Sequence, residues 1–164
     1  MINKKQLTER SFTPSQLSGF DGVHSIQLPV DFIHDLSKAD SLQAVLDTIA
    51  YWISHVFDAD RASITLQDTE EYLKLYSISG NHAIPMDFKI PIGQTFVGRV
   101  FAQSQLIICD DLAQSDELDC KMLSEHGMGT CMDAPMIHNG MCIGTLNVAD
   151  QRKHHYTLQQ AILL

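Results

Sequence analysis

The stretch that most constrains the fold is residues 129–150, GTCMDAPMIHNGMCIGTLNVAD. At its centre stands the step Asn139–Gly140, and an Asn-Gly pair readily adopts the positive φ angles that a two-residue hairpin turn requires. The residues on either side mix apolar side chains with small or hydrogen-bonding ones. This pattern predicts two antiparallel strands, with one face on a helical layer and the other beside a shielded concavity.

Composition limits the classes of protein to consider. The chain has 164 residues, of which 45% are hydrophobic, enough for one domain with a full core. The net charge of −9 leaves no basic surface for phosphate attraction, which argues against a nucleic-acid partner. No apolar run is long enough to span a bilayer, and the N-terminus lacks the apolar core of a secretory signal. We therefore expect a cytoplasmic protein that is not inserted in a membrane.

Four cysteines occur at a regular spacing of 11 residues, at Cys109, Cys120, Cys131 and Cys142. No two form a C-x-x-C pair, and no neighbouring His and Cys have the spacing of a zinc site. In a reducing compartment such residues usually behave as small apolar side chains. We expect four free thiols and no metal centre.

The first half of the chain divides into a leader and a helical region. Residues 1–28 lack periodicity and are predicted to be a flexible or loosely docked leader, followed by a single domain over 29–164. Pro29 can open a short helix over 30–39. Asp40 is predicted to cap the next helix, with Gln43 in the capping-box position. The apolar stripe of that helix should pack on the sheet and leave a surplus edge for self-association; it comprises Leu42, Val45, Leu46, Ile49, Trp52, Ile53, Val56 and Phe57.

Three strands and two short helices are predicted between this helix and the hairpin. Residues 61–68 alternate as in a half-buried strand, and 72–79 should pair with them as an antiparallel neighbour. Residues 88–92 form a third strand, which Pro91 places at a sheet edge. Thr95 is predicted to cap a helix over 96–103, and a short strand follows at 106–109. A second helix is predicted over 118–126, with Leu118, Met122 and Leu123 inward and Gly127 as its terminator.

The C-terminal segment, residues 156–164, begins a further helix and stops in the middle of its apolar pattern. We expect this helix to be a truncated connector that runs on into an output domain.

Several short motifs, taken in order, resemble those of a GAF domain. The motifs lie in two segments, IPIGQTFVGRVFAQSQLIICDDL (90–112) and EHGMGTCMDAPMIHNGMCIGTLNVAD (125–150). They contain a glycine turn at Gly93, a Gly-x-Val step at Gly98, a strand followed by Asp111, and the strand motifs at 132–136 and 140–146. The resemblance covers about residues 40–164. It implies an α+β, GAF/PAS-like fold with an antiparallel sheet of about six strands, end helices on one face, and a ligand pocket under short helices and loops on the other.

Candidate ligand-binding residues are polar side chains within otherwise apolar, enclosed stretches, since small-molecule sites combine an apolar cavity with a few converging polar groups. No catalytic residue is assigned. Each candidate has an alternative role in capping a turn or filling a strand. The candidates are Asp111, His126, Thr130, Cys131, Asp133, Thr145 and Asn147.

The ligand and any cofactor stay open at this point. GAF domains that bind cyclic nucleotides carry an Asn-Lys step and a later acidic pair, whereas Asn147 is followed by Val148. Bilin-binding members attach the pigment to a Cys that is often followed by His, whereas Cys120 is followed by Lys121. A haem would need an axial ligand, for which His126 is the only candidate near the expected pocket.

The resemblance implies a non-enzymatic regulatory sensor of a bacterial signalling protein. It would bind a small ligand, form a homodimer through its end helices, or both, and so control a diguanylate cyclase, phosphodiesterase, nucleotide cyclase or histidine kinase. The alternative is a thiol enzyme similar to free methionine-R-sulfoxide reductase, using Cys109 and Cys131. A reactive thiolate needs a nearby cation or helix N-terminus, and the sequence around Cys131 offers Asp133 instead.

Overall fold

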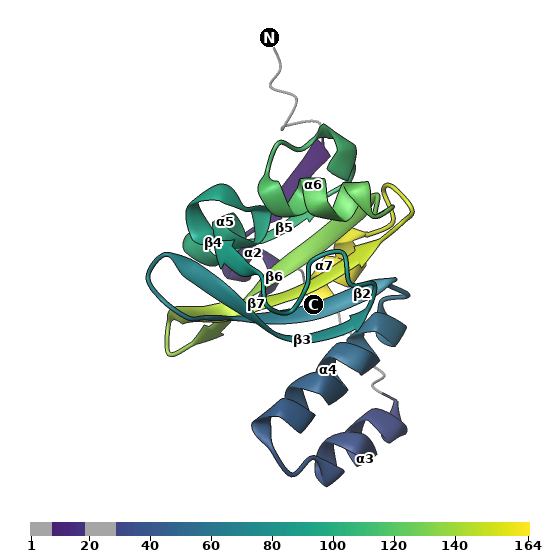
Figure 1. Cartoon of the computed structure of the whole chain (residues 1–164). Helices are drawn as coiled ribbons and strands as arrows, with labels where there is room; N and C mark the ends of the chain where they lie inside the picture. Colours follow the sequence, from purple (N-terminus) through teal and green to yellow (C-terminus); the bar gives the residue numbers. More distant parts are fainter. Residues whose placement is uncertain (1–7, 19–28) are drawn as a thin grey trace.

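The computed structural model describes residues 8–18 and 29–164. Within these ranges the chain forms one antiparallel sheet of seven strands (Figure 1), in the order β1-β5-β6-β7-β2-β3-β4. The α+β architecture is confirmed, with one strand more than the six or so predicted. The strands are β1 (Glu9–Phe12), β2 (Arg61–Gln67), β3 (Tyr72–Gly80), β4 (Lys89–Pro91), β5 (Leu106–Cys109), β6 (Thr130–His138) and β7 (Met141–Asp150).

Helices cover both faces of the sheet. One face carries α2 (Pro14–Ser18), α4 (Leu42–Val56) and α7 (Leu158–Leu163), and α3 (Val30–Lys38) lies against α4. The other face carries α5 (Phe96–Gln103) and α6 (Leu118–Glu125), with short 3-10 turns η1 (Ile92–Gln94) and η2 (Leu112–Gln114). This is the predicted layering. None of the helices in the described ranges is long and apolar enough to cross a membrane.

The β6–β7 hairpin has the predicted turn. Asn139 and Gly140 adopt φ angles of 50° and 76°, the left-handed pair that matches the twist of the flanking strands. The register shifts by one residue at Met136 and Ile137, near the tip. The remaining pairs run regularly from Thr130 opposite Asp150, and this register fixes which side chains share a face.

Strand β2 is buried on both faces, which corrects the prediction of a half-buried strand. Ala62 and Ile64 pack toward the α4 side of the sheet. Ser63 and Thr65, on the opposite face, are only 3% and 1% exposed. The sequence alternation is real, but the α5–α6 layer covers the polar face that was expected to meet solvent.

Hydroxyl side chains cap the N-termini of α4 and α5. Ser41, and not the predicted Asp40, caps α4, because its side chain accepts a hydrogen bond from the Ala44 amide. The Gln43 side chain instead donates to the Tyr76 carbonyl, so the predicted capping box is absent. Thr95 caps α5 as predicted and accepts from the Gly98 amide.

Part of the predicted leader is built into the sheet. Residues 9–12 form β1 and pair with β5 from Glu9 opposite Cys109 to Phe12 opposite Leu106. Arg10 strengthens this docking, since its Nη2 donates to the Asp110 carboxylate at 2.6 Å and its Nε donates at 3.0 Å. The prediction of a flexible or loosely docked leader is therefore wrong for this strand. Residues 1–7 and 19–28 lie outside the described ranges.

Helix α6 packs against the core through Leu123 and Met122, as predicted, but not through Leu118. Leu118 is 37% exposed, whereas Asp119 and Cys120 are buried together with Leu123. Asp119 faces inward because its carboxylate binds backbone amides at the start of α5. Gly127 terminates the helical segment with a φ of 88°, as predicted.

Candidate functional site

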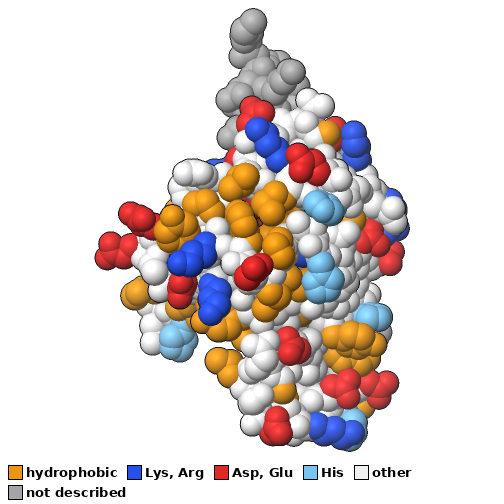
Figure 2. Space-filling model, in the orientation of Figure 1, with side chains coloured by type: hydrophobic (Ala, Val, Ile, Leu, Met, Phe, Trp, Pro, Cys, Tyr) orange, Lys and Arg blue, Asp and Glu red, His pale blue; other side chains and the backbone are white. Residues whose placement is uncertain are grey.

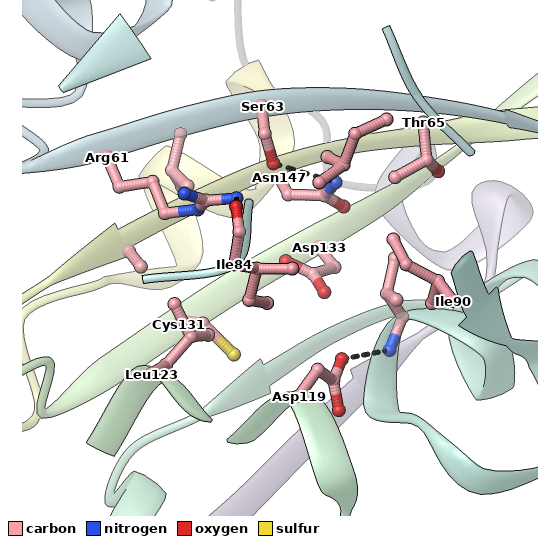
Figure 3. A pocket seen from close by; sticks show the side chains of 14 residues that line it. Arg61, Ser63, Thr65, Ile84, Ile90, Asp119, Leu123, Cys131, Asp133 and Asn147 are labelled. Atoms are coloured by element: carbon pink, nitrogen blue, oxygen red, sulfur yellow. Dashed lines mark hydrogen bonds between the residues drawn. The ribbon is translucent and has the colours of Figure 1, made fainter. Parts of the chain in front are cut away.

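A cavity lies between the sheet and the α5–α6 layer (Figure 3). The central strands β2, β6 and β7 supply most of its floor, and β3, β4, the loop between them, α5 and α6 supply the rest of its wall. Its polar lining consists of Arg61, Ser63, Thr65, Asp119, Cys131, Asp133 and Asn147. Its apolar lining consists of Leu75, Ile84, Ile90, Val97, Leu123 and Ala149; Val148 also borders it, although the Val148 side chain packs in the cluster on the other face of the sheet.

The cavity is narrow. The volume open to the centre of a water molecule is about 30 Å³, which is room for one or a few waters or a small polar head group. Pockets for drug-sized ligands are roughly ten times larger. A nucleotide or tetrapyrrole would therefore require the covering loop and helices to move apart.

Arg61 ties the β3–β4 loop to the sheet. This side chain is 3% exposed; its Nη1 donates to the Asn81 carbonyl at 2.5 Å and its Nη2 to the Ile84 carbonyl at 3.3 Å. Burial lowers the pKa of the guanidinium to about 10, against the opposing attraction of Asp133. Arg61 is still a cation at neutral pH, and its hydrogen bonds hold Ile84 over the cavity.

A row of three polar side chains crosses the floor. Asp133 on β6 lies directly opposite Asn147 on β7, which in turn lies opposite Ser63 on β2. Asn147 Nδ2 donates to Ser63 Oγ at 3.3 Å. Asp133 is 5% exposed, and burial, followed by the repulsion of Asp119, raises the pKa of its carboxyl well above the ordinary value, with only partial compensation from Arg61.

The opposite wall is fixed by Asp119. Its carboxylate accepts hydrogen bonds from the amides of Phe96 at 2.8 Å and Val97 at 3.0 Å. These are free N–H groups of the first turn of α5, where the helix dipole favours a negative charge. Asp119 thus joins the two helices that cover the cavity and has its own partners.

Three of the seven predicted ligand-binding residues, Cys131, Asp133 and Asn147, line this cavity. Thr145 lies just outside its lining. Its hydroxyl is 2.6 Å from that of Thr65, which does line it.

The other three predicted residues have local roles away from the cavity. Asp111 caps η2 by accepting from the Ala113 amide. His126 is exposed at the end of α6, with its Nδ1 2.9 Å from the Met122 carbonyl oxygen. Thr130 donates its hydroxyl to the Cys109 carbonyl at 2.6 Å. Each corresponds to the turn, cap or strand alternative that the sequence had left open.

Sequence reasoning missed four polar residues of the lining: Arg61, Ser63, Thr65 and Asp119. A signal for two of them was present, because Ser63 and Thr65 alternate with apolar residues just as Thr145 and Asn147 do. The two alternating strands pair in register, so their polar faces coincide. Asp119 carries no such signal, since one acidic residue in a short helix usually faces solvent.

Three of the thiols gather beside the cavity. Cys109 lies opposite Cys131 in the β5–β6 register, and Cys120 on α6 interacts with both. The neighbouring Cys120 thiol and burial raise the pKa of Cys109. Contact with Cys120 is the largest single effect on Cys131 and favours its thiolate, but burial and the repulsion of Asp133 together outweigh it and raise the pKa of Cys131. All four cysteines are free, and within the described ranges no group of three His, Cys, Asp or Glu residues could hold a metal ion.

The fold is shared with solved GAF-fold proteins. The GAF domain of a phosphoenolpyruvate-protein phosphotransferase (ptsP) from Coxiella burnetii is 18% identical, with a TM-score of 0.69 over 81% of this chain and 82% of that one. The Acinetobacter phosphoenolpyruvate-protein phosphotransferase GAF domain is 15% identical, with a TM-score of 0.67 over 81% of each chain. Free methionine-R-sulfoxide reductase from Neisseria meningitidis, solved with its substrate, is 20% identical, with a TM-score of 0.67 over 80% of this chain and 75% of that one.

These identities establish a shared fold and nothing finer. No protein of curated function matches the chain. The GAF domain family model matches residues 41–164, which is most of the chain and includes every strand except β1. This match and the common architecture agree, and the chain therefore belongs to the GAF domain family, whose members are generally regulatory sensor modules.

Proposed function

We propose that this GAF domain is the sensor of a bacterial signalling protein and that it binds a small ligand in the cavity between β2, β6, β7 and the α5–α6 layer. The observation that supports this is the convergence of Arg61, Asp133 and Asn147, with four further polar side chains, in one buried cavity whose remaining lining is apolar. Structural cores seldom bury so many polar groups together, because each loses its hydration.

The cavity is connected to the C-terminal helix through the same strands. Strand β7 leads directly to the segment before α7. On the reverse face of the sheet, the buried Tyr156 and Ala161 pack in one cluster with Met132 and Val148. A ligand that favours one arrangement of β6 and β7 would therefore bias the position of α7, to the extent that it binds the two arrangements differently. The output domain would be a cyclase, phosphodiesterase or histidine kinase.

Native mass spectrometry and thermal unfolding of the purified domain test ligand binding. We expect a small molecule to co-purify, or one member of a metabolite panel to raise the unfolding temperature saturably. Ala149→Ile, which fills the cavity, should abolish the effect, whereas Ala113→Ile on the surface should not. If no molecule binds, or if Ala149→Ile binds as well as the wild type, the cavity is not the sensor site.

A homodimer through the end helices is the second part of the proposal. Helices α3 and α4 lie side by side (Figure 1), joined by the hydrogen bond from Trp52 Nε1 to Asp35 at 2.9 Å. They expose a set of large apolar side chains, which would be buried in a helical dimer. These are Val30 at 81%, Ile33 at 58%, Leu42 at 66%, Tyr51 at 50% and Val56 at 39% exposed.

Analytical ultracentrifugation tests the dimer. Ile33→Glu combined with Leu42→Glu should weaken self-association at least tenfold, because charges would enter an apolar interface. Met141→Glu is the matched control, since Met141 is 68% exposed but lies at the hairpin tip. A monomeric wild-type domain, or a dimer unaffected by the helix variants, would contradict this part.

A thiol enzyme is the second candidate function, favoured by the position of Cys131 in the cavity lining beside Cys109 and Cys120. Two thiols could reduce free methionine sulfoxide to methionine, forming a disulfide and water, with dithiothreitol restoring the thiols. The raised pKa values of all three thiols oppose nucleophilic attack. We expect no turnover of free methionine sulfoxide. Turnover that disappears in Cys131→Ser would favour the thiol enzyme over the sensor.

A further inference from the structure

Two hydrogen-bond acceptors in the cavity have no donor. Asn147 Oδ1 is buried without a partner among the described residues, although the Nδ2 of the same amide donates to Ser63. In those same ranges no hydrogen bond reaches the carboxyl of Asp133, which is 5% exposed. Because the two residues are direct cross-strand partners, their side chains leave the same face of the sheet and lie side by side (Figure 3).

The other charged groups of the cavity do not supply the missing donors. Arg61 directs one hydrogen bond from each terminal nitrogen to the carbonyls of Asn81 and Ile84. The carboxylate of Asp119 is itself an acceptor, already bonded to the amides of Phe96 and Val97. Asp133 is therefore a buried acid without a hydrogen-bonded counter-ion, and burying a charge in this state is strongly unfavourable.

We propose that the cavity binds a small cationic amine head group, held by its N–H donors between the Asp133 carboxylate and Asn147 Oδ1. This inference rests on the proposed function of the cavity as a ligand site and names the chemistry of the ligand. The inference is based on the chemical match between site and ligand. The floor of the cavity presents two free acceptors, and an ammonium group presents three N–H donors and the positive charge that compensates Asp133.

The size and lining of the cavity agree with such a group. A volume of about 30 Å³ suits an ammonium or methylammonium head. The apolar lining suits a short alkyl portion, and apolar side chains also gather on the surface between α5, α6 and the β3–β4 loop (Figure 2). An anion would meet two carboxyl groups, Asp119 and Asp133, and would have to compete with the loop for Arg61.

Proton release is a further consequence of the arrangement. The charged groups that act on Asp133 are Arg61 on β2, Asp119 on α6 and Glu117 just before α6, and together with burial they raise the pKa of Asp133. In the empty cavity a protonated Asp133 can donate to Asn147 Oδ1, which satisfies both groups. A bound ammonium replaces that proton, so the affinity for the cation should rise with pH until Asp133 ionises in the empty domain.

The test uses the purified domain and two probes, ammonium chloride and methylammonium chloride, with sodium chloride and sodium acetate as references. Binding is followed by amide chemical shifts in ¹H–¹⁵N spectra at pH 5.5 and 8. We expect saturable shifts at Ser63, Asp133 and Asn147 with the two cation probes alone, and tighter binding at pH 8. Asp133→Asn should lose at least tenfold in affinity, whereas Asp116→Asn, an exposed acid near α6, should behave like the wild type.

Asn147→Leu provides a second variant, which removes the Oδ1 acceptor and should weaken methylammonium binding several-fold. If acetate shifts the cavity amides and the cations do not, the head-group assignment is wrong while the sensor site stands. If Asp133→Asn binds methylammonium as tightly as the wild type, the assignment is also wrong. If neither probe perturbs the cavity, the assignment fails, and the mass-spectrometric experiment decides separately whether the cavity binds anything.

Discussion

The carboxylate of Asp119 on α6 accepts a hydrogen bond of 2.8 Å from the backbone amide of Phe96, the first residue of α5. A side chain from one covering helix thus caps the other. We expect Asp119→Ala to lower the free energy of unfolding by about 2–3 kcal/mol, because amides of the α5 first turn would be left buried without partners. Urea denaturation measures the loss. Asp116→Ala should change stability by less than about 0.5 kcal/mol, and equal values for the two variants would contradict the capping role.

Arg61 should control the mobility of the loop over the cavity. Arg61→Met removes the donors to the Asn81 and Ile84 carbonyls while keeping an apolar stem of similar length. We expect hydrogen exchange of amides in residues 81–84 to accelerate at least tenfold, since the loop loses two hydrogen bonds worth about 1–3 kcal/mol in all. Lys121→Met, at an exposed position of α6, is the control. Unchanged exchange in Arg61→Met would show that the loop is held by other contacts.

The hydroxyl pair of Thr65 and Thr145, 2.6 Å apart and fully buried, should behave as a coupled unit. Replacing either residue by Val leaves the other hydroxyl unsatisfied and should cost about 1–3 kcal/mol. The double Val variant should be nearly as stable as the wild type, because two methyl groups of the same shape replace the pair. A double-mutant cycle from urea denaturation measures the coupling, and additive effects would argue against it.

Two glycines in one segment should respond oppositely to alanine. A Cβ on Gly98 would overlap the backbone of Ile92, whereas a Cβ on Gly93 would meet no atom within 4 Å. We expect Gly98→Ala to destabilise the domain by about 2–4 kcal/mol, since α5 would have to move away from η1. Gly93→Ala should change the unfolding temperature little. Similar unfolding temperatures for both variants would be inconsistent with this close approach.

The buried Asp133 should make stability depend on pH. The pKa of Asp133 is raised in the folded state. Its contribution to the free energy of unfolding is therefore full below about pH 3.9, the pKa of Asp in the unfolded chain, and is lost as the pH rises through the pKa of Asp133 in the folded domain. Asp133→Asn should therefore raise the unfolding temperature of the empty domain at pH 8 and leave it nearly unchanged at pH 4. Scanning calorimetry across this range is the measurement. An Asp133→Asn variant that loses stability at pH 8 would mean that the ionised acid has a stabilising partner.

Local signals in the sequence were reliable where the backbone itself determines the outcome. The Asn139–Gly140 turn and the Thr95 cap occur as predicted, because positive φ angles and unpaired helix amides require particular residues at particular places. For α4 the predicted cap, Asp40, is wrong by one residue, since Ser41 caps the helix. The ordered motifs from Gly93 to Leu146 sufficed for the fold, since they specify turns and strand ends along one chain.

The polar floor of the cavity was predicted in part. Cys131 and Asp133 were identified because they come just before apolar residues of the first hairpin strand, and Asn147 because it alternates with apolar residues in the second. Arg61 was not, since nothing near it in the chain shows that its strand is covered on both faces. The loop carbonyls that hold Arg61 lie 20 and 23 residues away in the chain.

By itself, the sequence determined the order of the elements from α3 onward, the hairpin turn, the Thr95 cap and the family, because these depend on interactions between residues close together along the chain. The tertiary structure alone decided that Glu9–Phe12 joins the sheet, that Asp119 turns inward, and which polar side chains meet in the cavity. The salt bridge of Arg10 and Asp110 spans 100 residues, and pairs so distant leave no local pattern. Their geometry exists only once the sheet register and the helical layers bring the segments together.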